Sequence, residues 1–187
     1  MAGIREQGRA ENTARILASA RSQIAQQGAA GLSMRAVARD VGMVSSAVFR
    51  YFPNREALLT ELIIESYGHL AGAVEQAVAE VDGGPAQLWR AAALAARDWA
   101  RAFPHEFQLI YGTPVPDYQA PPQTIPAAAR VAAPFLDISA TGAVAELAQV
   151  IGFISLELAG HFRGVVDDTD AFFREVVERQ VSTLGLD

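Results

Sequence analysis

The sequence of 187 residues contains no cysteine. It therefore has no disulfide, no thiol nucleophile and no cysteine-based metal site, a composition that fits an intracellular protein. No apolar run reaches the roughly 18 residues of a membrane-spanning helix without a charge or a proline. The N-terminal segment MAGIREQGRAENTARI is polar and lacks the apolar core of a signal peptide. These absences predict a soluble, cytoplasmic protein with no membrane partner.

The side chains that most enzymes and metal sites use are scattered along the chain. The three histidines, His69, His105 and His161, lie far apart and form no HxxxH or HExxH pair, so we expect no metal site. The sequence also contains no phosphate-binding glycine loop and no evident pairing of a nucleophile with a base. We therefore predict no cofactor and no enzymatic activity. Turnover of a molecule bound in an aromatic cavity is the enzymatic alternative.

Lysine is absent too, so all 15 positively charged side chains are arginines, and they are unevenly distributed. Residues 1–60 hold eight arginines against four acidic residues, a net charge of +4. Residues 61–187 hold seven arginines against 17 acidic residues, a net charge of −10. This asymmetry favours a basic N-terminal part that binds a polyanion and an acidic remainder that does not.

Apolar residues recur with the helical period along most of the chain, and no alternating run indicates a β-strand. The sequence therefore predicts an all-α fold. A first helix ends near Gly28, and a long helix capped by Asn54 runs to about residue 80. The segment 112–126 contains five prolines and predicts a long loop. Further helices are expected at 86–103, from there to Tyr111, and at 127–138, 142–163 and 168–184.

Two short predicted helices, 33–41 and 45–52, are joined by a tight turn at Gly42 and form a helix-turn-helix. Ser33 is the expected N-cap of the first. The second is too short to be stable alone, so Val48 and Phe52 must pin it to the core. This leaves Ser45, Ser46, Phe49 and Arg50 facing outward, as a surface slim enough to enter the major groove of DNA.

The long helix begins with a cation, Arg55, where the helix dipole disfavours positive charge by roughly 0.3–1 kcal/mol. A DNA phosphate bound at this point would offset the conflict, because both Arg55 and the free N–H groups of the helix attract it. Tyr51 can add a hydroxyl contact to the same row of phosphates.

The segment GLSMRAVARDVGMVSSAVFRYFPNREALL, residues 31–59, resembles the DNA-binding domain of the tetracycline-repressor (TetR) family, and the similarity extends without a gap from about Ala14 to Leu59. Phe49 lacks the hydroxyl of the family's tyrosine, which reduces its role to packing against the sugar. Val44 replaces the family's serine cap, so we expect the cap to shift to Ser45. Arg55 replaces a lysine and keeps its charge.

The resemblance implies a DNA-binding surface whose residues have different roles. Arg35 and Arg50 are the expected base-edge contacts, and Ala47 is the small residue of the family pattern. Phosphate contacts are expected from Ser33, Tyr51 and Arg55, and either kind of contact from Ser45 and Ser46. The implied domains are a helix-turn-helix domain (1–54), a connecting helix (55–80) and a regulatory domain (81–187).

The resemblance also implies that the regulatory domain binds a small molecule. The segment RAFPHEFQLIYGTPVP, residues 101–116, is similar to a subgroup with a WHG-type C-terminal domain. The expected ligand-binding residues are aromatic walls and a few polar groups: Trp89, Trp99, Phe103, Phe107, Tyr111, Asp98, His105, Tyr118 and His161. Each aromatic residue is open to the alternative of an ordinary core position. Glu146 and Glu157 are either pocket groups or rim groups of an interface.

We expect a homodimer through helices 143–162 and 168–184, because one short recognition helix gives too little contact for specificity. The alternative is that these faces pack within one chain. The predicted function is that of a DNA-binding transcriptional regulator, a repressor that binds a palindromic operator and is released by a small hydrophobic or aromatic effector. The alternative is a regulator of the same fold that activates transcription or responds to no ligand.

Overall fold

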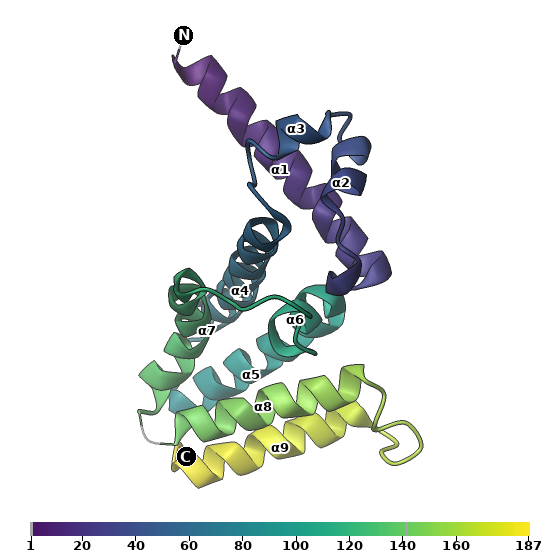
Figure 1. Cartoon of the computed structure of the whole chain (residues 1–187). Helices are drawn as coiled ribbons and strands as arrows, with labels where there is room; N and C mark the ends of the chain where they lie inside the picture. Colours follow the sequence, from purple (N-terminus) through teal and green to yellow (C-terminus); the bar gives the residue numbers. More distant parts are fainter. Residues whose placement is uncertain (1, 141) are drawn as a thin grey trace. The chain divides into compact units, whose positions relative to one another are not determined.

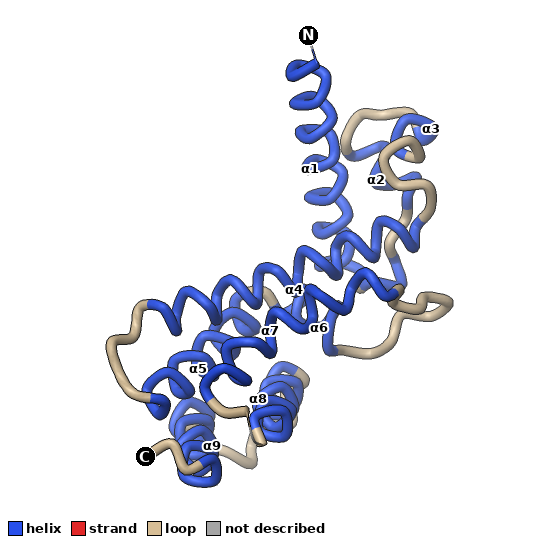
Figure 2. The backbone as a smooth tube through the Cα atoms, turned by 90° about the vertical axis from the view of Figure 1, so that its left-hand side faces the viewer, coloured by secondary structure: helices blue, strands red, loops and turns tan. Residues whose placement is uncertain are grey.

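The structure, a computed structural model, describes residues 2–140 and 142–187. These residues form α-helices joined by turns and short 3₁₀ helices, with no β-strand among them, which confirms the all-α prediction (Figures 1 and 2). They divide into two compact units. The first unit comprises residues 1–64 and 113–122, and the second comprises 65–112 and 123–187.

The first unit begins with α1 (Ala2–Gln27), which stops at Gly28, where φ is 72°. The 3₁₀ helix η1 (Ala29–Gly31) leads into α2 (Met34–Asp40), whose N-terminus is capped by Ser33 as predicted. The hydroxyl of Ser33 accepts a hydrogen bond from the Ala36 N–H at 3.4 Å. Gly42 makes the turn after α2 with φ of 69°, a conformation that glycine adopts without strain.

The recognition helix α3 (Ser45–Val48) is shorter than the eight residues predicted, and residues 49–51 continue it only as turns. Its N-cap is Val44, with no side-chain cap, so the expected shift of the cap to Ser45 is wrong. Helical bonds remain from the Phe49 N–H to the Ser45 carbonyl and from the Phe52 N–H to the Val48 carbonyl. The predicted anchors are confirmed, because Val48 and Phe52 are both buried.

The long helix α4 (Arg55–Ala79) is capped as predicted: the Asn54 side-chain oxygen accepts from the Ala57 N–H at 2.8 Å. Its residues up to Ile64 belong to the first unit and those from Glu65 to the second. The first unit also contains most of the proline-rich segment, residues 113–122. There the hydroxyls of Tyr118 and Thr60 lie 3.0 Å apart and are hydrogen-bonded.

Five further helices complete the second unit, and α8 and α9 run side by side in opposite directions (Figure 1). The chain leaves the proline-rich segment through η2 (Pro122–Thr124). α8 is shorter than expected because the chain turns at Gly160, where φ is 80°. The five helices are α5 (Pro85–Ala102), α6 (Pro104–Tyr111), α7 (Ile125–Ile138), α8 (Ala143–Leu158) and α9 (Thr169–Leu184).

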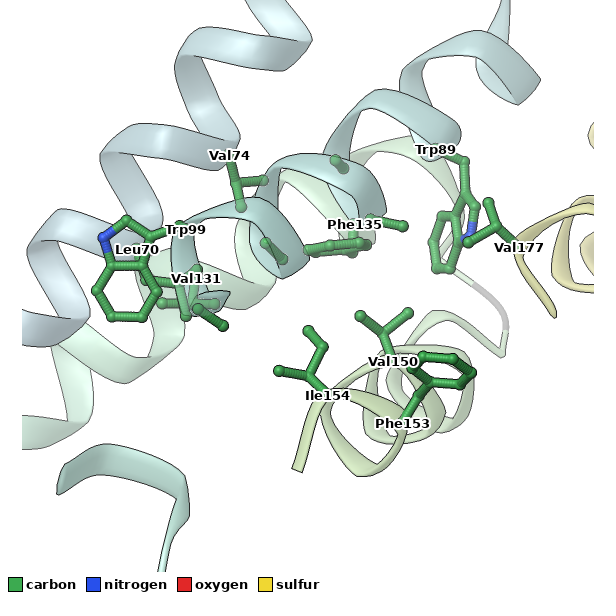
Figure 3. Packing of buried hydrophobic residues seen from close by; sticks show 14 of the residues in the cluster. Leu70, Val74, Trp89, Trp99, Val131, Phe135, Val150, Phe153, Ile154 and Val177 are labelled. Atoms are coloured by element: carbon green, nitrogen blue, oxygen red, sulfur yellow. The ribbon is translucent and has the colours of Figure 1, made fainter. Parts of the chain in front are cut away.

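The core of the second unit is built from apolar side chains (Figure 3). The buried amide of Gln180 crosses it. Trp89 stacks edge-on against Phe135, with ring centroids 5.2 Å apart. The indole N–H of Trp89 donates to the side-chain oxygen of Gln180 at 3.1 Å. The Gln180 side-chain nitrogen in turn donates to the Glu146 carbonyl at 3.0 Å and to the Gln149 side chain at 2.8 Å. This amide therefore fixes α5, α8 and α9 in register.

A buried arginine joins the same three helices a few turns away. The Arg97 guanidinium donates to both oxygens of Glu157, at 2.8 and 2.6 Å, and to Asp170 at 2.7 Å. It also lies over the ring of Phe173, 4.9 Å from the centroid. The pKa of Asp170 is held below its usual value, chiefly by the hydrogen bond from Arg97. Arg90, on the same helix α5, forms a similar but exposed pair with Glu178.

These two arginines make a matched test of the core. Arg97→Ala leaves the largely shielded Glu157, whose side chain is 13% exposed, without its partner, so we expect the free energy of unfolding to fall by about 3–5 kcal/mol. Arg90→Ala removes an exposed pair that solvent screens, so its effect on stability should be much smaller. Both tryptophans lie in α5, so urea unfolding followed by tryptophan fluorescence reports on this unit. Equal losses in the two variants would contradict a special role for Arg97.

Candidate nucleic-acid interface

The outward faces of α2 and α3 form a polar and basic surface of the first unit. Arg35 and Arg39 are exposed on α2, opposite the buried Met34 and Val37. The helical spacing produces this separation, because residues three or four apart share one face. Arg35 is thus accessible, as a base-edge contact requires, and Arg39 adds a second accessible cation to the same face.

The surface continues over α3 and the turn that follows it. Ser46 and Arg50 are exposed, while Ser45 and Ala47 are half-buried. Two apolar side chains are exposed beside them: Val44 at 71% and Phe49 at 44%. In the major groove of DNA such side chains can contact a thymine methyl group or a sugar.

Tyr51 connects this surface to α1. Its hydroxyl oxygen accepts a hydrogen bond from the Asn12 side-chain nitrogen at 3.1 Å. The guanidinium carbon of Arg9 lies 5.3 Å from the centre of the Tyr51 ring, within cation–π range. Our sequence reasoning missed both α1 residues. Their signal in the sequence is weak: both precede Ile16, the first buried residue among the described side chains of α1.

Arg55 is bound within the first unit. Its guanidinium donates to the carbonyl oxygens of Leu32 at 3.2 Å, Ala29 at 2.8 Å and Ala30 at 3.3 Å. These carbonyls belong to η1 and the residue after it. Free carbonyl groups at the end of a helix carry partial negative charge. The positive charge at the start of α4 thus has an intramolecular explanation. The phosphate contact expected of Arg55 stays a prediction.

The nine residues predicted to bind a ligand are not gathered in one place. Trp89 and Phe107 are fully buried in the core of the second unit. Asp98 and His161 are exposed on its surface, and His105 is half-buried. Tyr118 belongs to the first unit, where it bonds to Thr60.

The structure does bring several of the predicted aromatic rings close together, in pairs. Trp99 and the exposed Phe103 have ring centroids 6.0 Å apart, and Phe107 and Tyr111 are 5.3 Å apart. Tyr111 also meets Tyr67 edge-on at 5.9 Å. Burial, and secondarily the neighbouring Tyr67 hydroxyl, raise the pKa of the Tyr111 hydroxyl above its ordinary value.

Sequence reasoning missed a buried carboxylate near these rings. Glu106, on α6, is 4% exposed, and one of its oxygens lies 2.8 Å from Nδ1 of His69 on α4. The two residues are 37 positions apart in the chain, so spacing gives no sign of the pair. Glu157, whose role the sequence left open, binds Arg97, and Glu146 is half-buried.

Two kinds of feature are absent from the part of the chain that the structure describes. No group of three histidine, cysteine, aspartate or glutamate side chains is arranged to hold a metal ion. None of the helices is both long enough and apolar enough to cross a bilayer.

Known families and relatives match both units. Residues 16–62 match a family described as bacterial regulatory proteins, tetR family. Residues 89–180 match a model described as tetracyclin repressor-like, C-terminal domain. The HTH-type transcriptional regulators Rv1816 of Mycobacterium tuberculosis and Mb1846 of Mycobacterium bovis are each 44% identical over 145 residues. That match spans 75% of this chain and 61% of the length of these curated relatives.

Solved structures extend the similarity to nearly the whole chain. The crystal structure of SCO4313, described as a regulatory protein, superposes with a TM-score of 0.84 at 32% identity. The superposition covers 95% of this chain and 98% of the SCO4313 chain. A protein from Rhodococcus sp. RHA1 superposes with a TM-score of 0.73 at 26% identity, covering 93% of this chain and 94% of its own.

The contacts of Arg55 generate a prediction about stability. Arg55→Ala removes three charge-assisted hydrogen bonds, so we expect the first unit to lose about 1–3 kcal/mol of stability. Hydrogen exchange of amides in residues 16–64, read by mass spectrometry, measures this loss locally. Arg39→Ala, an exposed arginine in the same unit, is the matched control and should change exchange little. If the amides of Arg55→Ala exchange as slowly as those of the parent protein, these hydrogen bonds do not stabilise the unit.

Proposed function

We propose that this chain, which belongs to the TetR family of transcriptional regulators, is a ligand-responsive repressor. It would bind a palindromic operator as a homodimer. The observation that carries the proposal is the surface of α2 and α3. Its anchors, Val48 and Phe52, are buried, while Arg35, Ser46 and Arg50 stay free to contact DNA. A helix so placed fits a major groove.

On this surface Arg50 and Arg35 are proposed to contact base edges. Arginine pairs with guanine through two parallel hydrogen bonds, so each half-site should contain at least one G·C pair that is read. Ser33, Tyr51 and Arg55 would bind phosphates, and Ser45 and Ser46 either phosphates or base edges.

A second copy of the chain is proposed to pack against α8. The apolar side chains predicted for α9, among them Phe173, Val177 and Val181, are buried within one chain and are not available to a partner. The outer side of α8 differs, because Val144 is 67% exposed and Leu156 47% exposed. Small exposed residues on the same helix, such as Ala148, permit close approach of a symmetric copy.

The effector is proposed to bind among the aromatic rings of α5 and α6. Trp99, Phe103 and Tyr111 offer flat apolar surface, and Glu106 with His69 offers polar groups that can orient a ligand. Because α4 contributes residues to both units, it is the element through which binding would bias the recognition helices.

DNA binding is tested with the duplex immediately upstream of the chain's own gene. We expect two chains per fragment in sedimentation, and a loss of affinity of tenfold or more for Arg50→Ala, since one bidentate base contact is worth about 1–3 kcal/mol. Arg163→Ala removes an exposed arginine of the second unit, so this variant has the same net charge as Arg50→Ala. It should bind DNA as tightly as the parent protein. A monomeric protein, or one that binds no duplex, overturns the proposal.

The effector is tested by a thermal-shift screen of small apolar and aromatic metabolites. A ligand at about 100 times its Kd should stabilise the protein by about 2.7 kcal/mol and, for a repressor, weaken binding to the upstream fragment. A stabilising ligand that strengthens DNA binding would favour the alternative of an activator. A screen without any stabilising compound would favour a regulator that responds to no ligand.

A further inference from the structure

The first half of α1 does not help to form the core. Among the described side chains of residues 6–15 none is buried, and the apolar stripe of the helix begins at Ile16. A helical extension that buries no apolar surface contributes little to stability and frays easily. Its side chains are instead attached to the recognition region by polar contacts, which points to a role outside folding.

These contacts converge on Tyr51, in the turn after α3. Arg9 lies over the Tyr51 ring and Asn12 bonds to its hydroxyl. One turn further along α1, Arg15 donates to the carbonyl of Val41, at the end of α2, at 2.7 Å. The exposed start of α1 is thus held beside the surface proposed to bind DNA.

The hydrogen-bond directions leave the Tyr51 proton available. The Asn12 side-chain oxygen accepts from Arg15 at 3.5 Å, so its nitrogen is the atom that donates to Tyr51. The hydroxyl oxygen of Tyr51 therefore acts as an acceptor toward Asn12. Its own O–H can donate to a group outside the protein.

The guanidinium of Arg9 is free as well. Within the described residues it forms no salt bridge and no hydrogen bond, and it is exposed to solvent. Glu11, two positions further along α1, accepts from Gln7. A planar cation and a hydroxyl donor, held next to each other, match the oxygens of one phosphate group.

We propose that Arg9 and Tyr51 together bind a backbone phosphate at the edge of each operator half-site, with Asn12 as the positioning residue that orients Tyr51. The proposal rests on the DNA-binding function above and adds α1 to the surface that carries it. The contact reads no base, because phosphates are the same at every step of the duplex. Arg9 should therefore raise the affinity for all duplexes equally.

The salt dependence of DNA binding tests this role. Each phosphate neutralised contributes about 0.9 to the slope of log K against log salt concentration. For a dimer, Arg9→Ala should make the slope less steep by about 2 and weaken binding to the upstream fragment and to a random duplex by similar factors. Arg163→Ala has the same net charge and should leave the slope unchanged.

Two further variants separate the parts of the contact. Tyr51→Phe keeps the ring under Arg9 but removes a neutral donor, so affinity should fall several-fold with the slope unchanged. Asn12→Ala should have a smaller effect of the same kind. In the Tyr51→Phe background it should have no effect, because Asn12 acts through the missing hydroxyl.

Each outcome is decisive. If the parent protein binds duplex DNA and Arg9→Ala keeps its slope, the inference fails while the proposed function stands. If the parent protein binds no duplex, the proposed function itself fails. Far-UV circular dichroism should give Arg9→Ala the melting temperature of the parent, since no core contact is lost, and a lower melting temperature would assign Arg9 to folding.

Discussion

A recognition helix of four residues has almost no stability of its own, so the DNA-binding surface depends on the burial of Val48 and Phe52. These side chains hold a short stretch of backbone against the core of the first unit, to which α2 contributes. The side chains on the opposite side of that stretch are then not needed for the core. The hydrogen bonds of Arg55 also support this surface, because they hold the segment of η1 that leads into α2.

The second unit uses polar side chains for a different purpose. Leucine, alanine and phenylalanine surfaces on α5, α8 and α9 could slide against each other at little cost, because apolar contact has no direction. Gln180 and Arg97 remove that freedom, since their hydrogen bonds are satisfied in one register only. The proposed effector site, which is built from flat aromatic rings, would need walls held in this way.

Local patterns in the sequence predicted local structure well. Ser33, Gly42 and Asn54 act where cap and turn chemistry place them, and Val48 and Phe52 are buried as the helical period requires. The local errors are the cap and length of α3 and the length of α8. Contacts made far along the chain were not predicted at all: the partners of Arg55 lie 23–26 residues away, Trp89 meets a residue 91 positions away, and Tyr118 bonds to one 58 positions away. Periodicity carries no information about such pairs, so it predicts which face of a helix is buried but not which distant residue lies against it.

The proline-rich segment also has a consequence for how the protein is made. Because residues 113–122 belong to the unit that begins at the N-terminus, neither unit is one continuous stretch of chain. A ribosome that has released residues 1–64 has not yet supplied Tyr118, the partner of Thr60. The N-terminal unit therefore reaches its final set of contacts only after α5 and α6 have left the exit tunnel. Its completion during synthesis is tied to the emergence of the second unit.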